Sequence, residues 1–200
     1  DINEAYKSLV DQLLNADPKV KLALANAIFY RKEFTVKEPF VAIMDNDYSA
    51  EIKGLDFSAP SALTTINKWA SDNTSKKIEK VLDEIDGDAV MFIMNALYFN
   101  GDWSNQFDKS KTEERTFYPD GSNSVEVATM NGEVGSKVVS GNGFKAIEIP
   151  YGRSNFTMIV VVPDETLSSF YPSFAHQLWS QITADLDGKS EFGKMIVFMP

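Results

Sequence analysis

The longest apolar run in the sequence extends from Ala89 to Phe99 and contains one polar residue, Asn95. Acidic turn residues at 86–88 precede this run, and an Asn-Gly pair at 100–101 closes it. A continuous apolar run between turn signals is typical of a strand buried on both faces. Its length also allows a buried helix, but flanking glycines and the β-branched and aromatic residues between them favour the strand. Asn95 would then need a hydrogen-bond partner, because an unpaired buried amide costs about 1–3 kcal/mol.

Apolar positions with helical spacing predict helices in three places. These are residues 2–14, 60–70 and 165–186, the last in two pieces separated by Pro172. Pro60 suits the first turn of the second helix, with Ser58 or Ser61 as its cap. A short helical turn is expected over residues 78–85. Residues 35–44 stay open between a short helix and an edge strand, since a proline interrupts them.

Shorter apolar or alternating segments predict the remaining strands. They lie at residues 20–30, 51–57, 115–118, 125–130, 137–139, 144–149, 156–162 and 195–199. Turn residues at 119–122 connect strand 115–118 to strand 125–130, and those at 141–143 connect strand 137–139 to strand 144–149, as hairpin-like pairs. The pattern therefore predicts an α+β chain with at least two antiparallel sheets and helices packed on them.

Composition narrows the function classes. The 200 residues carry a net charge of −10, which argues against binding nucleic acid or an acidic membrane surface. No apolar run is long enough to span a bilayer. Cysteine is absent, so disulfides and thiol catalysis are excluded. Because the chain begins within a helical pattern and ends on a strand at residues 195–200, we expect it to be part of a longer protein.

Candidate catalytic chemistry is sparse. The single histidine, His176, lies in a helical segment and is expected at its surface. The segment around Ser154 lacks the second glycine of a nucleophile elbow. Acidic residues at 83–88 lack the alternate spacing of a calcium loop, and residues 141–143 lack the third glycine of a dinucleotide site. The sequence therefore predicts no enzyme, no metal site and no cofactor.

Six segments, in a constant order from about Leu9 to Pro200, match the motifs of one known family: residues 66–78, 94–103, 125–130, 147–152, 156–163 and 197–200. The first, with Asn67-Lys-Trp69, resembles the helix and exit motif of serpins. The second, with Asn95, resembles the third strand of their large sheet A. The third departs from the family's V-x-V-P-M-M motif, with Ala128 for proline and Thr129 for the first methionine. The last three resemble strands of sheet B and the start of the L-P-K/R-F strand.

The resemblance implies a serpin-like α+β fold with mixed β-sheets, which are parts of sheets A, B and C, and with helices packed on them. Residues 1–200 would form one partial domain, without the N-terminal helices and the C-terminal reactive-centre loop region. The implied function is inhibition of serine or cysteine endopeptidases by suicide insertion of that loop into sheet A. A non-inhibitory serpin acting as a carrier, chaperone or storage protein is the alternative, and a generic α+β binding domain is a more distant one. The hinge of the reactive-centre loop would distinguish an inhibitory from a non-inhibitory serpin, but it lies outside this sequence.

The resemblance also assigns roles to residues of this chain. Asn95 matches the buried shutter position, and Trp103 matches the breach, where the loop enters; plain core packing is the alternative for both. The strand that accepts the loop would carry Val90, Phe92, Met94, Ala96 and Tyr98. The helix lying over sheet A would contribute Ile66, Asn67 and Trp69. No catalytic residue and no reactive site is expected in this chain.

The expected partners follow from the same resemblance. They are a target protease, reached through a loop that is not in this chain, and the complementary C-terminal serpin segment. We expect no cofactor, no nucleic acid and no membrane span, and a secreted or periplasmic location.

Overall fold

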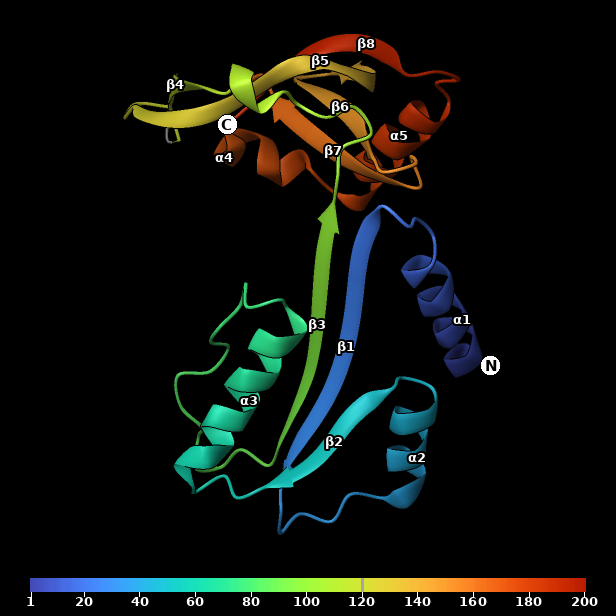
Figure 1. The fold of residues 1–200 in the computed structure, drawn as a ribbon, viewed down its shortest axis with the longest axis vertical. Coiled ribbons are helices and arrows are strands. Elements are labelled where there is room, and N and C mark those ends of the chain that lie inside the picture. Colours follow the sequence, from blue (N-terminus) through green and yellow to red (C-terminus); the bar gives the residue numbers. More distant parts are fainter. Residues whose placement is uncertain (120) are drawn as a thin grey trace. The chain divides into compact units, whose positions relative to one another are not determined.

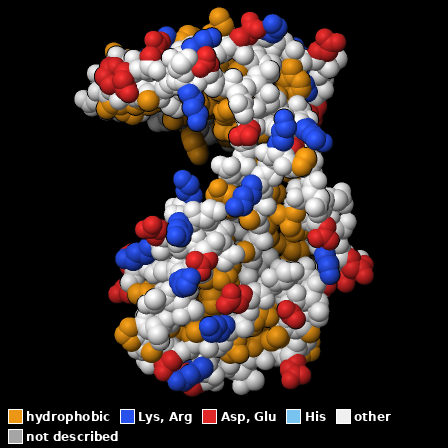
Figure 2. Space-filling view, in the orientation of Figure 1, with side chains coloured by type: hydrophobic (Ala, Val, Ile, Leu, Met, Phe, Trp, Pro, Cys, Tyr) orange, Lys and Arg blue, Asp and Glu red, His pale blue; other side chains and the backbone are white. Residues whose placement is uncertain are grey.

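The computed structural model describes residues 1–119 and 121–200, which form two compact units, residues 1–100 and 101–200 (Figure 1). Each unit is described by itself. Among the described residues, no helix is both long and apolar enough to cross a membrane. Hydrophobic side chains reach the surface of both units between the charged ones (Figure 2).

The first unit consists of three helices and a three-stranded sheet. In chain order these are α1 (Ile2–Leu14), β1 (Val20–Arg31), α2 (Glu38–Asn46), β2 (Ala50–Leu55), α3 (Pro60–Asn73) and β3 (Met91–Gly101). The strand order is β2-β1-β3, and β1 runs parallel to β2. β3 runs antiparallel to β1, because the far end of β1 meets the residues before β3 while its middle meets the middle of β3.

The core of this unit lies between α3 and one face of the sheet (Figure 1). Ile66 is fully buried, and Trp69 packs edge-on against Phe29 of β1, with ring centroids 6.2 Å apart. Ala27 and Ala96 supply the small side chains that let the helix approach β1 and β3. The predicted apolar face of α3 is therefore confirmed. α1 forms as predicted, but none of its residues is buried.

Two local expectations in this unit are corrected. The N-cap of α3 is Ala59, without a side-chain hydrogen bond, so neither serine caps the helix; Pro60 does occupy its first turn. Residues 78–85 form no helical turn. Residues 35–44, for which a helix and an edge strand were both possible, form most of α2. The proline falls in the first turn of this helix, where no backbone hydrogen bond is lost.

Asp56 fixes the entry to α3 in place of a cap. Its carboxylate accepts hydrogen bonds from the backbone and hydroxyl of Ser58 and from the ammonium of Lys32, 2.7 Å away. The hydrogen bond from Lys32, followed by those from Ser58, lowers the pKa of Asp56 to about 2. The carboxylate therefore connects the end of β1 to the segment leading into the helix.

We expect this connection to make stability depend on pH below neutrality. The pKa of Asp56 is lower in the folded protein than the usual value of about 3.9, so its contribution is complete above about pH 4 and is lost as the pH falls toward 2. Asp56→Asn should destabilise the full-length protein at pH 5, and the difference from wild type should shrink at lower pH. Urea denaturation across this range measures it, and a difference independent of pH would contradict it.

The second unit is mainly antiparallel sheet. Its elements are a 3-10 turn (Lys109–Lys111), β4 (Glu113–Phe117), β5 (Val125–Gly141), β6 (Phe144–Tyr151), β7 (Phe156–Pro163), α4 (Leu167–Phe170), a 3-10 turn (Tyr171–Ser173), α5 (His176–Asp187) and β8 (Gly193–Met199). The strand order is β4-β5-β6-β7, and β8 also pairs with β5. The predicted strands at 125–130 and 137–139 are one continuous strand of 17 residues.

β5 is continuous because it pairs with three strands in succession. Its first part pairs with β4, its middle with β8 and its last part with β6. Gly132 and Gly135 lie in the middle part, where a Cβ atom would come within 3.2 Å of Phe107 and 3.0 Å of Asn105. The two glycines therefore allow these side chains to pack closely against the strand. The predicted turn at 141–143 is confirmed, with Gly143 at a φ of +81°.

Candidate functional site: the edge strand and the helix over it

The side chains of β3 alternate between two environments. Phe92, Met94 and Ala96 face α3 and join the core of the first unit. Ile93 and Leu97 point the other way and are 74% and 58% exposed. The prediction of a strand is confirmed, but the prediction that both its faces are buried is wrong. Among the described residues, α3 and its connection cover one face, whereas these two side chains on the opposite face stay open to solvent.

The strand begins later than predicted, at Met91 instead of Ala89. Arg31 explains this start, because its guanidinium donates hydrogen bonds to the carbonyl oxygens of Gly87 and Ala89, at 2.6 and 2.7 Å. Its backbone N–H donates to the carbonyl of Val90 at 2.9 Å. Val90 therefore precedes β3, where Arg31 holds the chain. The other four residues predicted for the accepting strand lie within β3: Phe92, Met94, Ala96 and Tyr98.

β3 is an edge strand in this unit. Its neighbour on one side is β1, and no described strand pairs with its other edge. An open edge carries a row of backbone N–H and C=O groups that can bind a further strand. The strand therefore has the geometry required to add a neighbour by backbone hydrogen bonding.

Asn95 lies on the face of β3 away from α3 and is exposed, so the prediction that it is buried is wrong. Its need for a partner is nevertheless met. The side-chain Nδ2 donates to the carbonyl oxygen of Ala25 at 3.3 Å and to Oδ1 of Asn26 at 3.0 Å. Both partners belong to β1. The amide therefore connects the edge strand to its one neighbour through a side chain as well as through the backbone.

Asn26 was not singled out in the sequence, although a signal was present. It is the one polar residue between Leu22 and Phe29, just as Asn95 is in its own apolar run. Two such interruptions in adjacent strands suggest a polar pair, because buried or half-buried amides require partners. The pairing itself depends on the strand register, which the sequence does not specify.

The three predicted residues of α3 have two different roles. Ile66 and Trp69 belong to the core. Asn67 lies on the flank of the helix, where its Oδ1 accepts hydrogen bonds from the backbone N–H groups of Val81 and Leu82, at 2.8 and 3.0 Å. Its Nδ2 donates to the carbonyl of Leu82 at 2.9 Å. Asn67 thus fastens the connection between α3 and β3 against the helix.

This arrangement predicts that Asn67→Ala loosens the connection without unfolding α3. Losing three hydrogen bonds should raise the rate of tryptic cleavage at Lys76, Lys77 and Lys80 about three- to tenfold. Limited proteolysis of the full-length protein with peptide mapping measures this rate. Asn73→Ala is the matched control, because its amide bonds only to Trp69 within the helix. Equal acceleration in both variants would contradict the assignment.

Trp103 lies in the second unit and packs against aromatic neighbours. Its ring stacks on Tyr151, with centroids 4.3 Å apart, and meets Phe107 edge-on at 5.9 Å. Burial raises the pKa of the Tyr151 hydroxyl. The contacts of Trp103 are therefore those of a packed aromatic side chain. Its role at the breach, where the loop would enter, stays a prediction.

Other candidate features contribute little chemistry. His176 is an exposed first residue of α5, with its Nε2 3.5 Å from the hydroxyl of Ser180. In the part of the chain that the structure describes, no group of three histidine or acidic side chains is arranged to hold a metal ion.

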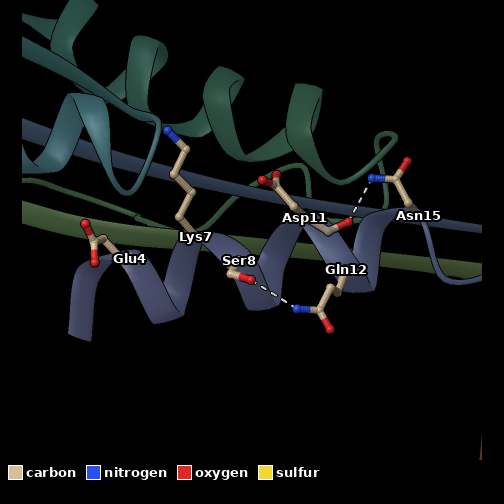
Figure 3. A pocket seen from close by; sticks show the side chains of 6 residues that line it. All are labelled: Glu4, Lys7, Ser8, Asp11, Gln12 and Asn15. Atoms are coloured by element: carbon tan, nitrogen blue, oxygen red, sulfur yellow. Dashed lines mark hydrogen bonds between the residues drawn. The ribbon is translucent and has the colours of Figure 1, made fainter. Parts of the chain in front are cut away.

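A shallow depression on α1 is lined by residues of this one helix: Glu4, Lys7, Ser8, Asp11, Gln12 and Asn15 (Figure 3). Gln12 and Asn15 bond to groups within the helix, so the depression is a solvated polar face. The candidate site is therefore β3 with its cover.

A sheet with an open edge strand, covered by a helix that side chains hold in place, defines a fold able to accept a further strand. The serpin family (serine protease inhibitor) matches residues 1–200, so the chain belongs to the serpin family. The resemblance and the serpin-like α+β fold with mixed sheets are confirmed. The pattern's prediction of two antiparallel sheets is wrong for the first sheet, because β1 runs parallel to β2.

Relatives of this chain include serpin-like proteins from microbes and from a tick. An uncharacterized serpin-like protein of Methanosarcina acetivorans is 29% identical over 90% of this chain and 44% of its own length. One of Methanosarcina mazei is 30% identical over 88% of this chain and 43% of its own length. Iripin-3 of Ixodes ricinus is 28% identical over 82% of this chain and 43% of its own length. The chain spans less than half the length of these relatives.

Solved serpin structures match the whole chain. The thermophilic serpin tengpin, 25% identical, matches with a TM-score of 0.86 in its native state and 0.84 in its latent state. The chain covers 51% and 54% of those two structures. Reactive loop cleaved human thyroxine-binding globulin, 22% identical, matches with a TM-score of 0.87 over 59% of its length, which supports the fold alone.

Proposed function

We propose that this chain is the loop-accepting part of a protease inhibitor that acts by suicide insertion into sheet A. The observation that carries the proposal is β3, which pairs with β1 on one edge only among the described residues. Membership of the serpin family supplies the class of activity. The chain contributes the strand and its cover, and the target would be a serine or cysteine endopeptidase reached through the reactive-centre loop.

The proposed mechanism separates the chemistry from the trap. The nucleophile of the protease attacks the scissile carbonyl of the loop, which forms an acyl-enzyme and releases the new amino terminus. The cut loop then pairs with the open edge of β3 as an added strand. This insertion carries the attached protease along and distorts its active site before water can cleave the acyl bond. The inhibitor itself needs no catalytic residue.

The cover over β3 would regulate this insertion. α3 and its connection lie on the face of β3 that carries Phe92 and Met94, and Asn67 fastens the connection. Asn95 ties β3 to β1 on the opposite face. On this basis we assign Asn95 to the shutter role. From the family resemblance alone we propose that Trp103 has the breach role and that the protein acts outside the cytoplasm, secreted or periplasmic.

The decisive experiment is to mix the full-length protein with trypsin-like and elastase-like serine proteases and a papain-like cysteine protease. A covalent complex that survives denaturing electrophoresis is expected with at least one of them. Cleavage of the protein as an ordinary substrate by every protease tried, without such a complex, would instead favour a non-inhibitory carrier, chaperone or storage protein.

Asn95→Ala tests the shutter role. Each of the two hydrogen bonds lost is worth about 0.5–1.5 kcal/mol, so the rate of conversion to latent or polymeric forms on mild heating should change by about fivefold or more. Native electrophoresis measures this conversion, and the melting temperature should change little. Asn100→Ala, at the exposed end of the same strand, is the control. An unchanged latent and polymer fraction in Asn95→Ala would count against the role.

A further inference from the structure

Asn26 is the centre of a chain of hydrogen bonds that extends beyond β3. Its Oδ1 accepts from Asn95, as described above. Its Nδ2 donates to the backbone carbonyl of Tyr48 at 2.8 Å and to the hydroxyl of Tyr6 at 3.2 Å. Both hydrogens of this amide are therefore used, and its orientation is fixed by two groups from outside the sheet. One of them, Tyr6, lies on α1.

α1 is attached to the unit mainly through polar and aromatic contacts. The ring of Tyr6 stacks on that of Tyr48, with centroids 4.5 Å apart. The hydroxyl of Tyr48 donates to the side-chain oxygen of Asn3, and the ammonium of Lys7 donates to the backbone carbonyl of Asn46 at the end of α2. In Figure 3 the side chain of Lys7 extends from α1 toward the neighbouring ribbon, whereas Gln12 points away from it.

We propose that α1 positions Asn95 through Tyr6 and Asn26, so that the attachment of α1 controls how firmly β3 is held to β1. Tyr6 and Asn26 are positioning residues, since neither lies on the open edge. The coupling stands on the contacts within this unit, and its consequence for protease trapping rests on the proposed function.

The physical reason is the geometry of the amide group. A primary amide has its donor and acceptor fixed on one plane, so the bonds of Nδ2 determine where Oδ1 points. If the hydroxyl of Tyr6 is removed, Asn26 keeps one fixed donor bond and gains freedom to turn. The acceptor of Asn95, Oδ1 of Asn26, is then held less firmly in place. A network of this kind couples distant groups because each bond orients the next.

The chain provides a closely matched pair of variants. Tyr6→Phe and Tyr48→Phe each remove one hydroxyl from the same ring stack, but only the first hydroxyl contacts Asn26. The backbone carbonyl of Tyr48, which also binds Asn26, is present in both variants. In the full-length protein, hydrogen exchange of the backbone amides at residues 93–97 should become about three- to tenfold faster in Tyr6→Phe and stay unchanged in Tyr48→Phe.

A double-mutant cycle tests whether the effect passes through Asn26. Asn26→Ala alone should accelerate the same exchange, and adding Tyr6→Phe to it should have no further effect. Equal acceleration in the two tyrosine variants, no acceleration in Tyr6→Phe, or additive effects in the cycle would overturn the proposal. If Tyr6→Phe does not fold, Asn26→Ala decides alone, and unchanged exchange in that variant would overturn it.

A second readout separates this coupling from the proposed function. The yield of denaturant-resistant protease complex should fall in Tyr6→Phe relative to Tyr48→Phe if looser anchoring of β3 favours premature closure of the sheet. The protein could trap no protease while hydrogen exchange at residues 93–97 still responds as expected. That result would support the coupling of α1 to Asn95 and contradict the proposed function.

Discussion

The first unit is arranged around β3, which pairs with β1 on one edge and with no described strand on the other. Pairing with β1 fixes one edge, and Arg31 fixes the point where the strand begins. α3 covers one face, with Ile66 and Trp69 in the core and Asn67 holding the connection. Together these contacts hold β3 in place with one neighbouring strand among the described residues.

The restraints differ in how easily they can be released. The contact between α3 and the sheet buries aromatic and aliphatic side chains, so separating it exposes apolar surface at about 25 cal/mol per Å². The bonds made by Asn67 and Asn95 are neutral hydrogen bonds whose partners can exchange with water at modest cost. The helix is therefore held to the sheet mainly by packing, while the polar bonds of Asn67 and Asn95 cost less to break.

The apolar run that predicts β3 was informative because strand propensity and the turn residues at its ends agreed. Its burial was predicted wrongly because an apolar residue such as Ile93 indicates what could be buried, while cover depends on other elements. Residues 78–85 failed as a helical turn because the amides of Val81 and Leu82 bond to the side chain of Asn67. Asn26 and Asn95 are far apart in the sequence, so their pairing required the strand register.

Family membership could be inferred from the sequence because its motifs keep their order along the whole chain, and the match over residues 1–200 bears this out. The details of the site could not. The role of Arg31 at the start of β3 depends on where β1 ends, and the polar contacts of Tyr6 depend on how α1 meets the turn before β2. Such contacts are set by the tertiary arrangement, which local patterns do not encode.

The serial pairing of β5 has a consequence for how the second unit folds. Its last part meets β6 through the short turn at Asn142-Gly143, so closing this hairpin costs little chain entropy. Its middle part meets β8 only after β6, β7 and both helices have been traversed. Because long loops close more slowly than short ones, the hairpin precedes the docking of β8. During synthesis, residues 130–136 in the middle of β5 therefore stay without this neighbour until the chain has been extended to Met199.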